Sequence, residues 1–392
     1  MIMKVLILTI TAGGGHNSTA RAIGDCLNSM GAQVRTLDTL YYLNKQLGET
    51  VSKGYLLSVD SMKYAYKSIY RQLEKRKKSG KLSASRMTNM LLSRKLCKYI
   101  DEYDPDVIVC THIFAATLID VLKVQSHIHA KTVGIVTDFA FHPYWEDTVH
   151  FDYVVTASEQ MIRQAYRKGY RDEQVLPFGI PINPKFSRSI TKSDARAQVG
   201  IDCDKPTLLF MSGSMGYGNL EEAVRELDEL EVDFQFLIVC GNNAEAKEKI
   251  ESMTLRKSAK IYGFTDQVDL LMDASDCIVT KPGGLTTSEA LSKELPMIIL
   301  NPIPGQEDRN VEFLLNNGAA MAVNDNYSVA DLVYILFSNP AKLEAMRTSV
   351  AVISKKDATR RLSDFIMHLD LVGHTNADSC DADKTAHAKL EN

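Results

Sequence analysis

The residues best suited to chemistry in this sequence are concentrated between positions 279 and 310. A short apolar run stops at Lys281, and Gly283-Gly284 follows before Thr286 and Glu289 open a helical pattern. The first turn of a helix carries backbone N–H groups without intrahelical partners and the positive end of the helix dipole. Because glycines let a ligand approach those groups closely, the stretch predicts an anion-binding site.

A second polar loop is predicted at the same edge of the sheet. Met297 to Leu300 form an apolar strand, and the segment after it contains Gln306, Glu307 and Asn310. Because the carboxyl ends of parallel strands lie along one edge, both loops are expected there. The Glu289 carboxylate could accept hydrogen bonds from both hydroxyls of a ribose; the alternative is an ordinary first-turn glutamate that the helix dipole favours.

A third loop follows the apolar strand predicted at 207–211, and a helix begins near Asn219. Its candidate binding residues are Ser212, Gly213, Ser214 and Gly216. A diphosphate is best held by backbone N–H groups with no side chains in the way, and this loop could supply them opposite Gly283-Gly284.

The N-terminal part of the chain offers a candidate base. An apolar strand at 5–10 leads into three glycines, which include Gly14 and Gly15, and then into His16, with a helix predicted from about Ser18. The dinucleotide spacing G-x-G-x-x-G is absent, and the glycines alone fit a tight turn equally well. A histidine at this strand end lies where open α/β sheets bind ligands, and its ordinary pKa of about 6.5 suits a general base.

Two more strand ends carry polar side chains. His112 follows the strand predicted at 107–110, and Asp138 follows the one at 132–136. Each taken alone is explained by a structural hydrogen bond, but three strand ends with His16, His112 and Asp138 should converge on one crevice. Trp145, the only tryptophan, would pack either against an acceptor there or in the core.

Together these motifs make the chain resemble the glycosyltransferases that make mono- and diglycosyl diacylglycerol. The resemblance spans about the first 370 residues and is carried by Lys281-Pro282-Gly283-Gly284, Glu289-Ala290-Leu291, Pro304-Gly305-Gln306-Glu307 with Asn310, Gly13-Gly14-Gly15-His16, Thr137-Asp138-Phe139 and His142-Pro143 with Trp145. It implies that Gly263 and Phe264 bind uracil and that Gln306 and Glu307 bind the sugar of a UDP-hexose. The loop at 212–215 departs from the more glycine-rich loop of galactolipid synthases, so glucose is favoured and galactose stays open.

The elements that must position these residues suggest two domains. Both halves begin with a strand, a glycine loop and a helix, which predicts two facing Rossmann-like α/β domains, the architecture called GT-B. We expect an acceptor domain at 1–185, a UDP-sugar domain at 200–350, a helix at 355–370 that crosses back to the first domain, and a disordered tail at 372–392.

Composition sets outer limits. A chain of 392 residues exceeds one ordinary core, and 45% apolar with 24% charged residues is typical of a globular protein. Scattered cysteines without a Cys-x-x-Cys pair and without a secretory signal favour the cytoplasm. No Asp, His or Cys cluster has metal-ligand spacing, so no metal or other cofactor is predicted.

An insertion at about 41–100 interrupts the α/β pattern. From Ser61 to Ile100 twelve Lys or Arg residues stand against one acidic residue, in a chain of net charge −4. Basic segments with interleaved tyrosines bind anionic membrane surfaces; the alternative is a solvated helix face and linker. The basic core of the insertion comprises Lys75, Arg76, Lys77, Lys78 and Lys81. Nucleic acid is not expected as a partner, because the excess is local.

The sequence therefore predicts an inverting, metal-independent hexosyltransferase at the inner face of the cell membrane. It would use His16 as base, with Asp138 beside it, and diacylglycerol or glycosyl-diacylglycerol as acceptor. Two alternatives stay open: an N-acetylglucosaminyltransferase acting on a polyprenyl-linked wall precursor, and a regulator that binds UDP-sugars without turnover.

Overall fold

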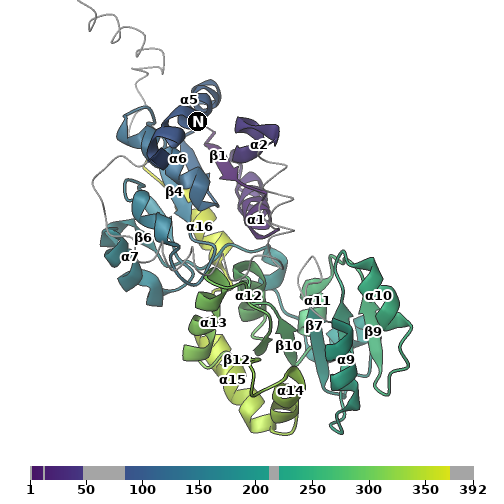
Figure 1. The fold of residues 1–392 in the computed structure, drawn as a ribbon. Coiled ribbons are helices and arrows are strands. Elements are labelled where there is room, and N and C mark those ends of the chain that lie inside the picture. The colour runs from purple at the N-terminus through teal and green to yellow at the C-terminus, as the bar shows by residue number, and fades with distance from the viewer. Residues whose placement is uncertain (1, 12–13, 47–83, 212–219, 371–392) are drawn as a thin grey trace, which may run out of the picture. The chain divides into compact units, whose positions relative to one another are not determined.

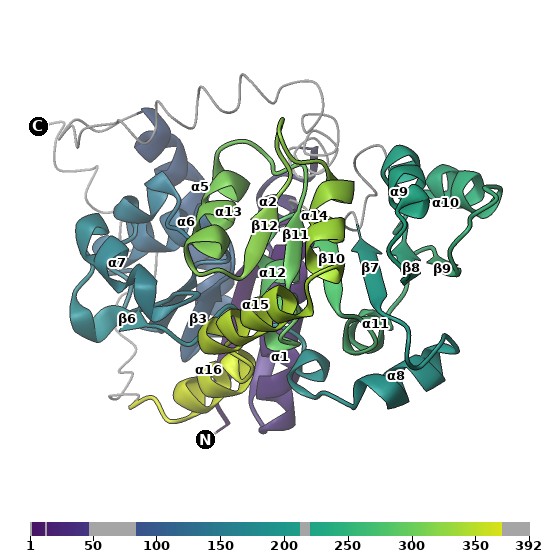
Figure 2. The same ribbon diagram turned by 90° about the horizontal axis from the view of Figure 1, so that it is seen from below.

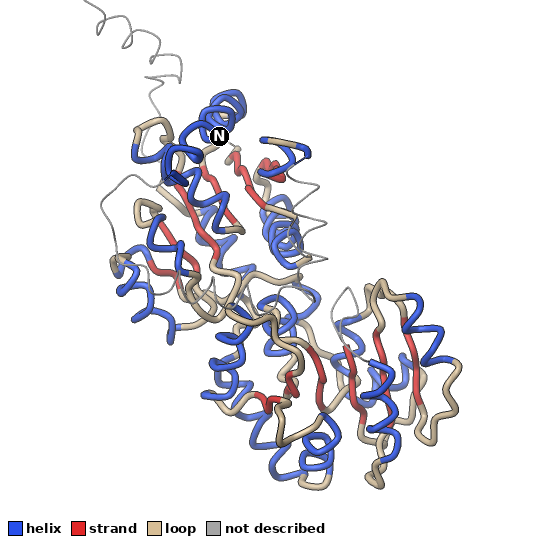
Figure 3. The backbone as a smooth tube through the Cα atoms, viewed as in Figure 1, coloured by secondary structure: helices blue, strands red, loops and turns tan. Residues whose placement is uncertain are grey.

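The structure is a computed structural model that describes residues 2–11, 14–46, 84–211 and 220–370 (Figure 1). The chain divides into two compact units. Unit 1 comprises residues 1–181 together with those from 358 onward, and unit 2 comprises residues 182–357. Each unit is a parallel β-sheet with helices packed against it (Figure 3).

Unit 1 has six parallel strands in the order β2-β1-β3-β4-β5-β6. The strands are β1 (Lys4–Thr9), β2 (Gln33–Asp38), β3 (Val107–Cys110), β4 (Lys131–Ile135), β5 (Tyr153–Val155) and β6 (Val175–Leu176). The helices are α1 (Gly15–Ser29), α2 (Thr39–Leu43), α5 (Ala84–Tyr103), α6 (Ile113–Val124), α7 (Ile162–Lys168) and α16 (Ala358–Met367), with 3-10 turns η1 (Pro143–Asp147), η2 (Glu159–Met161) and η3 (Asp172–Gln174).

The last helix of the described chain completes the core of unit 1. On α16, Leu362 and Ile366 are fully buried with Val5 and Ile7 of β1, and α16 packs along α1. Phe365 adds an edge-to-face contact with Tyr153 at a ring-centroid distance of 4.8 Å. The predicted crossing of the C-terminal helix back to the first domain is confirmed.

Unit 2 also has six parallel strands, in the order β12-β11-β10-β7-β8-β9, which Figure 2 shows from one edge to the other. The strands are β7 (Thr207–Met211), β8 (Gln235–Val239), β9 (Ala259–Tyr262), β10 (Cys277–Thr280), β11 (Met297–Ile299) and β12 (Ala320–Ala322). The helices are α8 (Lys192–Val199), α9 (Leu220–Glu229), α10 (Ala244–Glu251), α11 (Val268–Asp273), α12 (Gly284–Ser292), α13 (Gln306–Asn316), α14 (Val329–Phe337) and α15 (Pro340–Ile353), with the 3-10 turn η4 (Pro184–Ser187).

The central strands of both sheets are continuous apolar runs because helices cover them on both faces. All residues of β3, β7, β8 and β10 are buried. Strand β12 was not predicted from the sequence, since Ala-Met-Ala has neither β-branched residues nor an alternating polar face.

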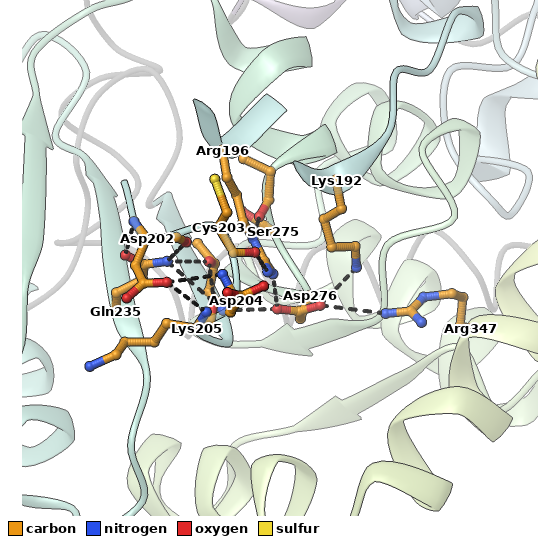
Figure 4. A network of polar contacts seen from close by, with 12 residues as sticks. Lys192, Arg196, Asp202, Cys203, Asp204, Lys205, Gln235, Ser275, Asp276 and Arg347 are labelled. Atoms are coloured by element: carbon orange, nitrogen blue, oxygen red, sulfur yellow. Dashed lines mark hydrogen bonds and ion pairs between the residues drawn. The ribbon is translucent and has the colours of Figure 1, made fainter. Parts of the chain in front are cut away.

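A polar network fixes the amino ends of β7 and β10 (Figure 4). Asp276 accepts hydrogen bonds from the backbone N–H of Thr207 at 2.8 Å, from Arg196 at 2.6 Å and from Lys192 at 2.7 Å. Arg347 of α15 lies 3.8 Å from the same carboxylate. The network ties α8 and α15 to the two strands whose opposite ends lead into the predicted phosphate loops.

The strand order reverses direction at one point in each sheet. In unit 1 the switch point lies between β1 and β3, and in unit 2 it lies between β7 and β10. Ligands of open α/β sheets bind outside the carboxyl ends of the strands at such points. The fold therefore selects the loops after these four strands as candidate sites.

Among the residues that the structure describes, no helix has the length and apolar character needed to cross a bilayer.

Candidate functional site

The switch point of unit 1 brings two imidazoles into contact. His16 lies in the first turn of α1, which begins at Gly15 and not near Ser18 as predicted, and His112 is the N-cap residue of α6. Their rings meet edge to face with centroids 4.6 Å apart. The prediction that the ends of the first and third strands converge is thereby confirmed for this pair.

The partners of His16 fix its tautomer. Its Nδ1 lies 2.7 Å from the carbonyl oxygen of Thr111 and 3.3 Å from Oγ1 of Thr137. A carbonyl oxygen only accepts hydrogen bonds, so Nδ1 carries the proton and Nε2 of the neutral ring keeps its lone pair. Asn17 helps to hold this loop, because its side chain bonds Thr9 and Thr11 at 2.9 Å each.

Burial keeps these rings uncharged. It lowers the pKa of His16, although the hydrogen bond to Thr111 opposes the shift. The pKa of His112 lies well below the usual value because of burial first and then the nearby His16 and His142. Burial and Lys168 lower the pKa of His142 to about 4. At neutral pH His16 is therefore a free base able to accept a proton.

The other candidates of unit 1 lie in three different environments: a loop, a helix terminus and the core. Asp138 is partly buried in the loop after β4, next to Thr137, and Gly14 is the exposed N-cap residue of α1. Trp145 is only 3% exposed and packs so tightly on Gly134 that a Cβ there would lie 2.8 Å from the indole. Trp145 is therefore a core residue, and the core alternative describes the structure.

In unit 2 the N-terminus of α12 forms the center of the candidate site. Gly283 is its N-cap residue, and Gly284 begins the helix directly after the loop that follows β10. Thr286 is partly exposed, whereas Thr287 is fully buried with a hydroxyl that has no hydrogen-bond partner in the described part of the chain. A helix that begins at a glycine turn has first-turn N–H groups without intrahelical partners, so the anion-binding site stays a prediction for this helix.

Glu289 lies one turn further along α12 and is half-buried. Within the described ranges no donor forms a hydrogen bond with its carboxyl group. Burial raises the pKa of Glu289 to about 8; the nearby Lys185 lowers it and Asp269 raises it. A half-buried acid without a donor is suited to receive hydroxyl groups from a ligand.

Sequence reasoning missed Lys185 and Asp269. Lys185 lies in η4, more than a hundred residues before Glu289, and its Nζ pairs with Asp269 of α11 at 2.9 Å. Two further contacts hold this turn on α12: Ser292 donates to the carbonyl of Phe186 at 3.0 Å, and Lys293 bonds that of Arg188. Residue spacing gave no sign of this contact, because Lys185 and Glu289 lie far apart in the sequence.

The loop after β11 supports the glycine turn. Glu307 accepts a hydrogen bond from the backbone N–H of Ile303, and its Oε1 would lie 3.8 Å from a Cβ placed on Gly283. Burial raises the pKa of Glu307 and Lys281 lowers it. Asn310 is fully buried and donates to the carbonyl of Pro282 at 2.8 Å, so it positions the turn from beneath.

Gly263 and Phe264 follow β9, and Phe264 is 72% exposed.

The remaining candidates lie outside the described residues. They are Ser212, Gly213, Ser214 and Gly216 of the loop after β7, the side chain of Gln306, and Lys75, Arg76, Lys77, Lys78 and Lys81 of the insertion.

Two family models match successive parts of the chain. Residues 16–182 match the monogalactosyldiacylglycerol (MGDG) synthase family, and residues 207–362 match the glycosyltransferase family 28 C-terminal domain. The first match begins at His16 and the second includes the glycine turn and Glu289.

Similarity to curated relatives spans nearly the whole chain. A processive diacylglycerol beta-glucosyltransferase of Bacillus pumilus is 30% identical over 94% of this chain and 96% of its own length. A probable chloroplastic monogalactosyldiacylglycerol synthase 2 of rice, Oryza sativa subsp. japonica, is 31% identical over 82% of this chain and 71% of its own length.

Solved structures show the same fold at low identity. MurG of Acinetobacter baumannii has a TM-score of 0.64 at 15% identity, covering 94% of this chain and all of its own. Anabaena HepE in complex with UDP-glucose has a TM-score of 0.53 at 14% identity, with the same coverage. The two parallel-sheet units thus form the GT-B architecture, and the chain belongs to the family of diacylglycerol glycosyltransferases that includes the processive glucosyltransferases and the MGDG synthases.

Proposed function

We propose that this protein transfers a hexose from a UDP-hexose to diacylglycerol or glycosyl-diacylglycerol, with glucose as the favoured sugar. The substrate class rests on similarity to the Bacillus glucosyltransferase across nearly the full length of both chains. The observation that carries the chemistry is the 2.7 Å contact between Nδ1 of His16 and the carbonyl of Thr111. It leaves Nε2 as a positioned base at a ligand-binding switch point.

In this reaction the acceptor hydroxyl attacks C1 of the sugar while the bond from C1 to the phosphate oxygen breaks. The hydroxyl proton passes to Nε2 of His16, and UDP leaves with the bonding electron pair. The sugar is α-linked in UDP-glucose, so attack from the opposite face gives a β-glycoside. This stereochemistry agrees with the beta-glucosyl name of the relative.

Unit 2 would stabilise the leaving diphosphate. The free N–H groups of the first turn of α12 and the Lys281 ammonium supply positive potential where negative charge develops. Glu289 would hold the ribose, and Phe264 would lie against the uracil. We propose that these groups suffice without a divalent metal ion.

We further propose that the insertion at about 41–100 docks the protein on the inner face of the cell membrane. Diacylglycerol stays in the bilayer, so an enzyme that uses it must reach the surface. In the described part of this region, Tyr42 of α2 meets Tyr99 of α5 edge to face with ring centroids 5.2 Å apart, and Nζ of Lys95 lies 5.0 Å from the Tyr42 ring centroid. Such mixed aromatic and basic surfaces suit the headgroup region of a membrane.

The test is incubation of the purified protein with UDP-glucose, UDP-galactose or UDP-N-acetylglucosamine and vesicles that contain diacylglycerol, followed by mass spectrometry of the lipids. A hexosyl-diacylglycerol is expected, and its yield should be unchanged by EDTA. Product formed only with UDP-N-acetylglucosamine and a polyprenyl-linked acceptor would overturn the proposal. UDP-sugar binding without turnover on either lipid would point to a regulator.

A further inference from the structure

His112 has the opposite tautomer to His16, with its proton on Nε2 instead of Nδ1. Its Nδ1 accepts a hydrogen bond from the backbone N–H of Phe114 at 3.0 Å, which caps the N-terminus of α6. A ring nitrogen that accepts a backbone N–H carries no proton, so the proton of the neutral ring lies on Nε2. His112 therefore presents a donor where His16 presents an acceptor.

Among the described residues, no polar group contacts the Nε2 atom of either ring. In the part of the chain that the structure describes, the polar contacts of both rings involve Nδ1 alone, and His16 and His112 are each partly exposed as whole residues. The ring centroids lie 4.6 Å apart, a separation that one small polar ligand can span. An alcohol beside a second oxygen fits this pair, because its hydroxyl proton is directed at one nitrogen and its neighbouring oxygen accepts from the other.

We infer that His112 binds the acceptor directly, donating from Nε2–H to the oxygen next to the attacking hydroxyl and so directing that hydroxyl at His16. The inference rests on the proposed function. Diacylglycerol and glycosyl-diacylglycerol both have an oxygen one or two carbons from every free hydroxyl, as the donor–acceptor pair requires. A simple alcohol without such an oxygen cannot form the hydrogen bond to His112 and is therefore a poor substrate for glycosylation.

Two substitutions separate the two nitrogens. In His112→Asn the side-chain oxygen occupies the position of Nδ1 and asparagine is a good N-cap residue, so the helix stays capped while the donor is lost. In His112→Gln the amide nitrogen reaches the position of Nε2 while the cap is lost. We expect His112→Asn to keep the thermal midpoint and to reduce kcat/KM for the lipid by roughly 5- to 150-fold, the cost of leaving one polar partner unpaired.

The same Asn variant should leave the KM for UDP-glucose unchanged, because the donor site lies in unit 2. His112→Gln should instead lower Tm by roughly 2–4 °C and recover most of the lipid kcat/KM. The matched control is His142→Asn, since His142 also accepts a backbone N–H at Nδ1, from Tyr144 at 3.3 Å, and caps η1. Full activity in His112→Asn, or an equal loss in His142→Asn, overturns the inference.

A substrate-free measurement keeps this test separate from that of the proposed function. Long-range 1H–15N correlation spectra of the histidine rings should show the proton on Nδ1 of His16 and on Nε2 of His112, assigned through the single variants. The same tautomer in both rings contradicts the inference even if glycolipid is made. If the wild-type protein makes no glycolipid, the proposed function is refuted. The spectra still decide whether the two rings have opposite tautomers.

Discussion

The two sheets carry different titratable groups at their switch points: histidine bases in unit 1 and a glutamic acid in unit 2. In unit 1 the strands at the switch point lead to His16 and His112, whose pKa values burial lowers. In unit 2 the corresponding strand β10 leads to a glycine turn and to Glu289, whose pKa burial raises to about 8. Burial keeps all three groups uncharged, although one set consists of bases and the other is an acid.

The consequence differs between the two sites. An uncharged histidine is already in the state that accepts a proton, so burial suits unit 1 to the proposed proton transfer. In the proposed ribose contact Glu289 accepts two hydroxyl hydrogen bonds, and it does so best as a carboxylate, so burial opposes that contact below about pH 8. We infer that unit 1 is organised for the reaction and unit 2 for a binding step coupled to proton release.

The largest expected effect comes from removing the base of unit 1. His16→Ala should lower kcat by about 10²–10⁴ while UDP binding stays nearly intact, because no group of unit 2 is altered. Steady-state kinetics and calorimetry measure the two quantities. His129→Ala, at an exposed position of the same unit, is the control. A His16 variant that keeps most of its turnover would show that the imidazole is structural.

Removing the acid of unit 2 should affect binding instead. Glu289→Ala is expected to weaken UDP and UDP-glucose alike by about 1.5–3 kcal/mol, the range for hydrogen bonds to a charged group. Glu248→Ala, on the exposed side of α10, is the matched control. Equal UDP affinity in the Glu289 variant and the wild type would remove the ribose role from this residue.

The pH dependence tests the proton release directly. UDP-glucose has no phosphate that titrates near neutrality, and in the proposed complex Glu289 is ionised. Its affinity should therefore rise about tenfold per pH unit up to pH 8 and level off above it. Lys185→Met removes the cation that lowers the pKa of Glu289, so the plateau should move to higher pH, while Lys185→Arg should retain it. A flat profile between pH 6 and 8 contradicts the coupling.

The smallest effect on turnover at saturating lipid is expected from the basic insertion. Changing Lys75, Arg76, Lys77, Lys78 and Lys81 to Gln should reduce sedimentation with anionic vesicles and raise the apparent KM for lipid, with UDP binding unchanged. Each basic residue near the headgroups contributes about 1 kcal/mol, screened by salt over about 10 Å. Glu74→Gln, in the same run, should act in the opposite direction. Equal binding to neutral and anionic vesicles would identify a solvated loop.

Much of the fold followed from the sequence because its signals are local. The apolar runs predicted the bounds of β3 and β7 to the residue, since buried parallel strands are apolar throughout. The start of α1 was placed too late, because its N-cap is Gly14, which has no side chain to mark a cap.

The site was only partly predictable because its decisive contacts are distant in sequence. The tautomer of His16 depends on the carbonyl of Thr111, a backbone atom that residue patterns do not identify. The same holds for Lys185, which faces Glu289 only after η4 packs against α12. For Trp145 the residue type alone does not decide the environment, since a tryptophan suits a lipid surface and a core equally well. The contact with Gly134 places it in the core.

The course of the chain through the two units has a consequence for biosynthesis. Unit 2 is one uninterrupted segment, so it can fold as soon as residue 357 has left the ribosome. Unit 1 starts first but lacks Leu362 and Ile366, two fully buried members of its core, until α16 has also emerged. Domains usually fold in the order of their synthesis. Here the N-terminal unit, which holds the proposed base, is completed last, so a nascent chain stalled before α16 exposes the apolar face of α1 to chaperones and proteases.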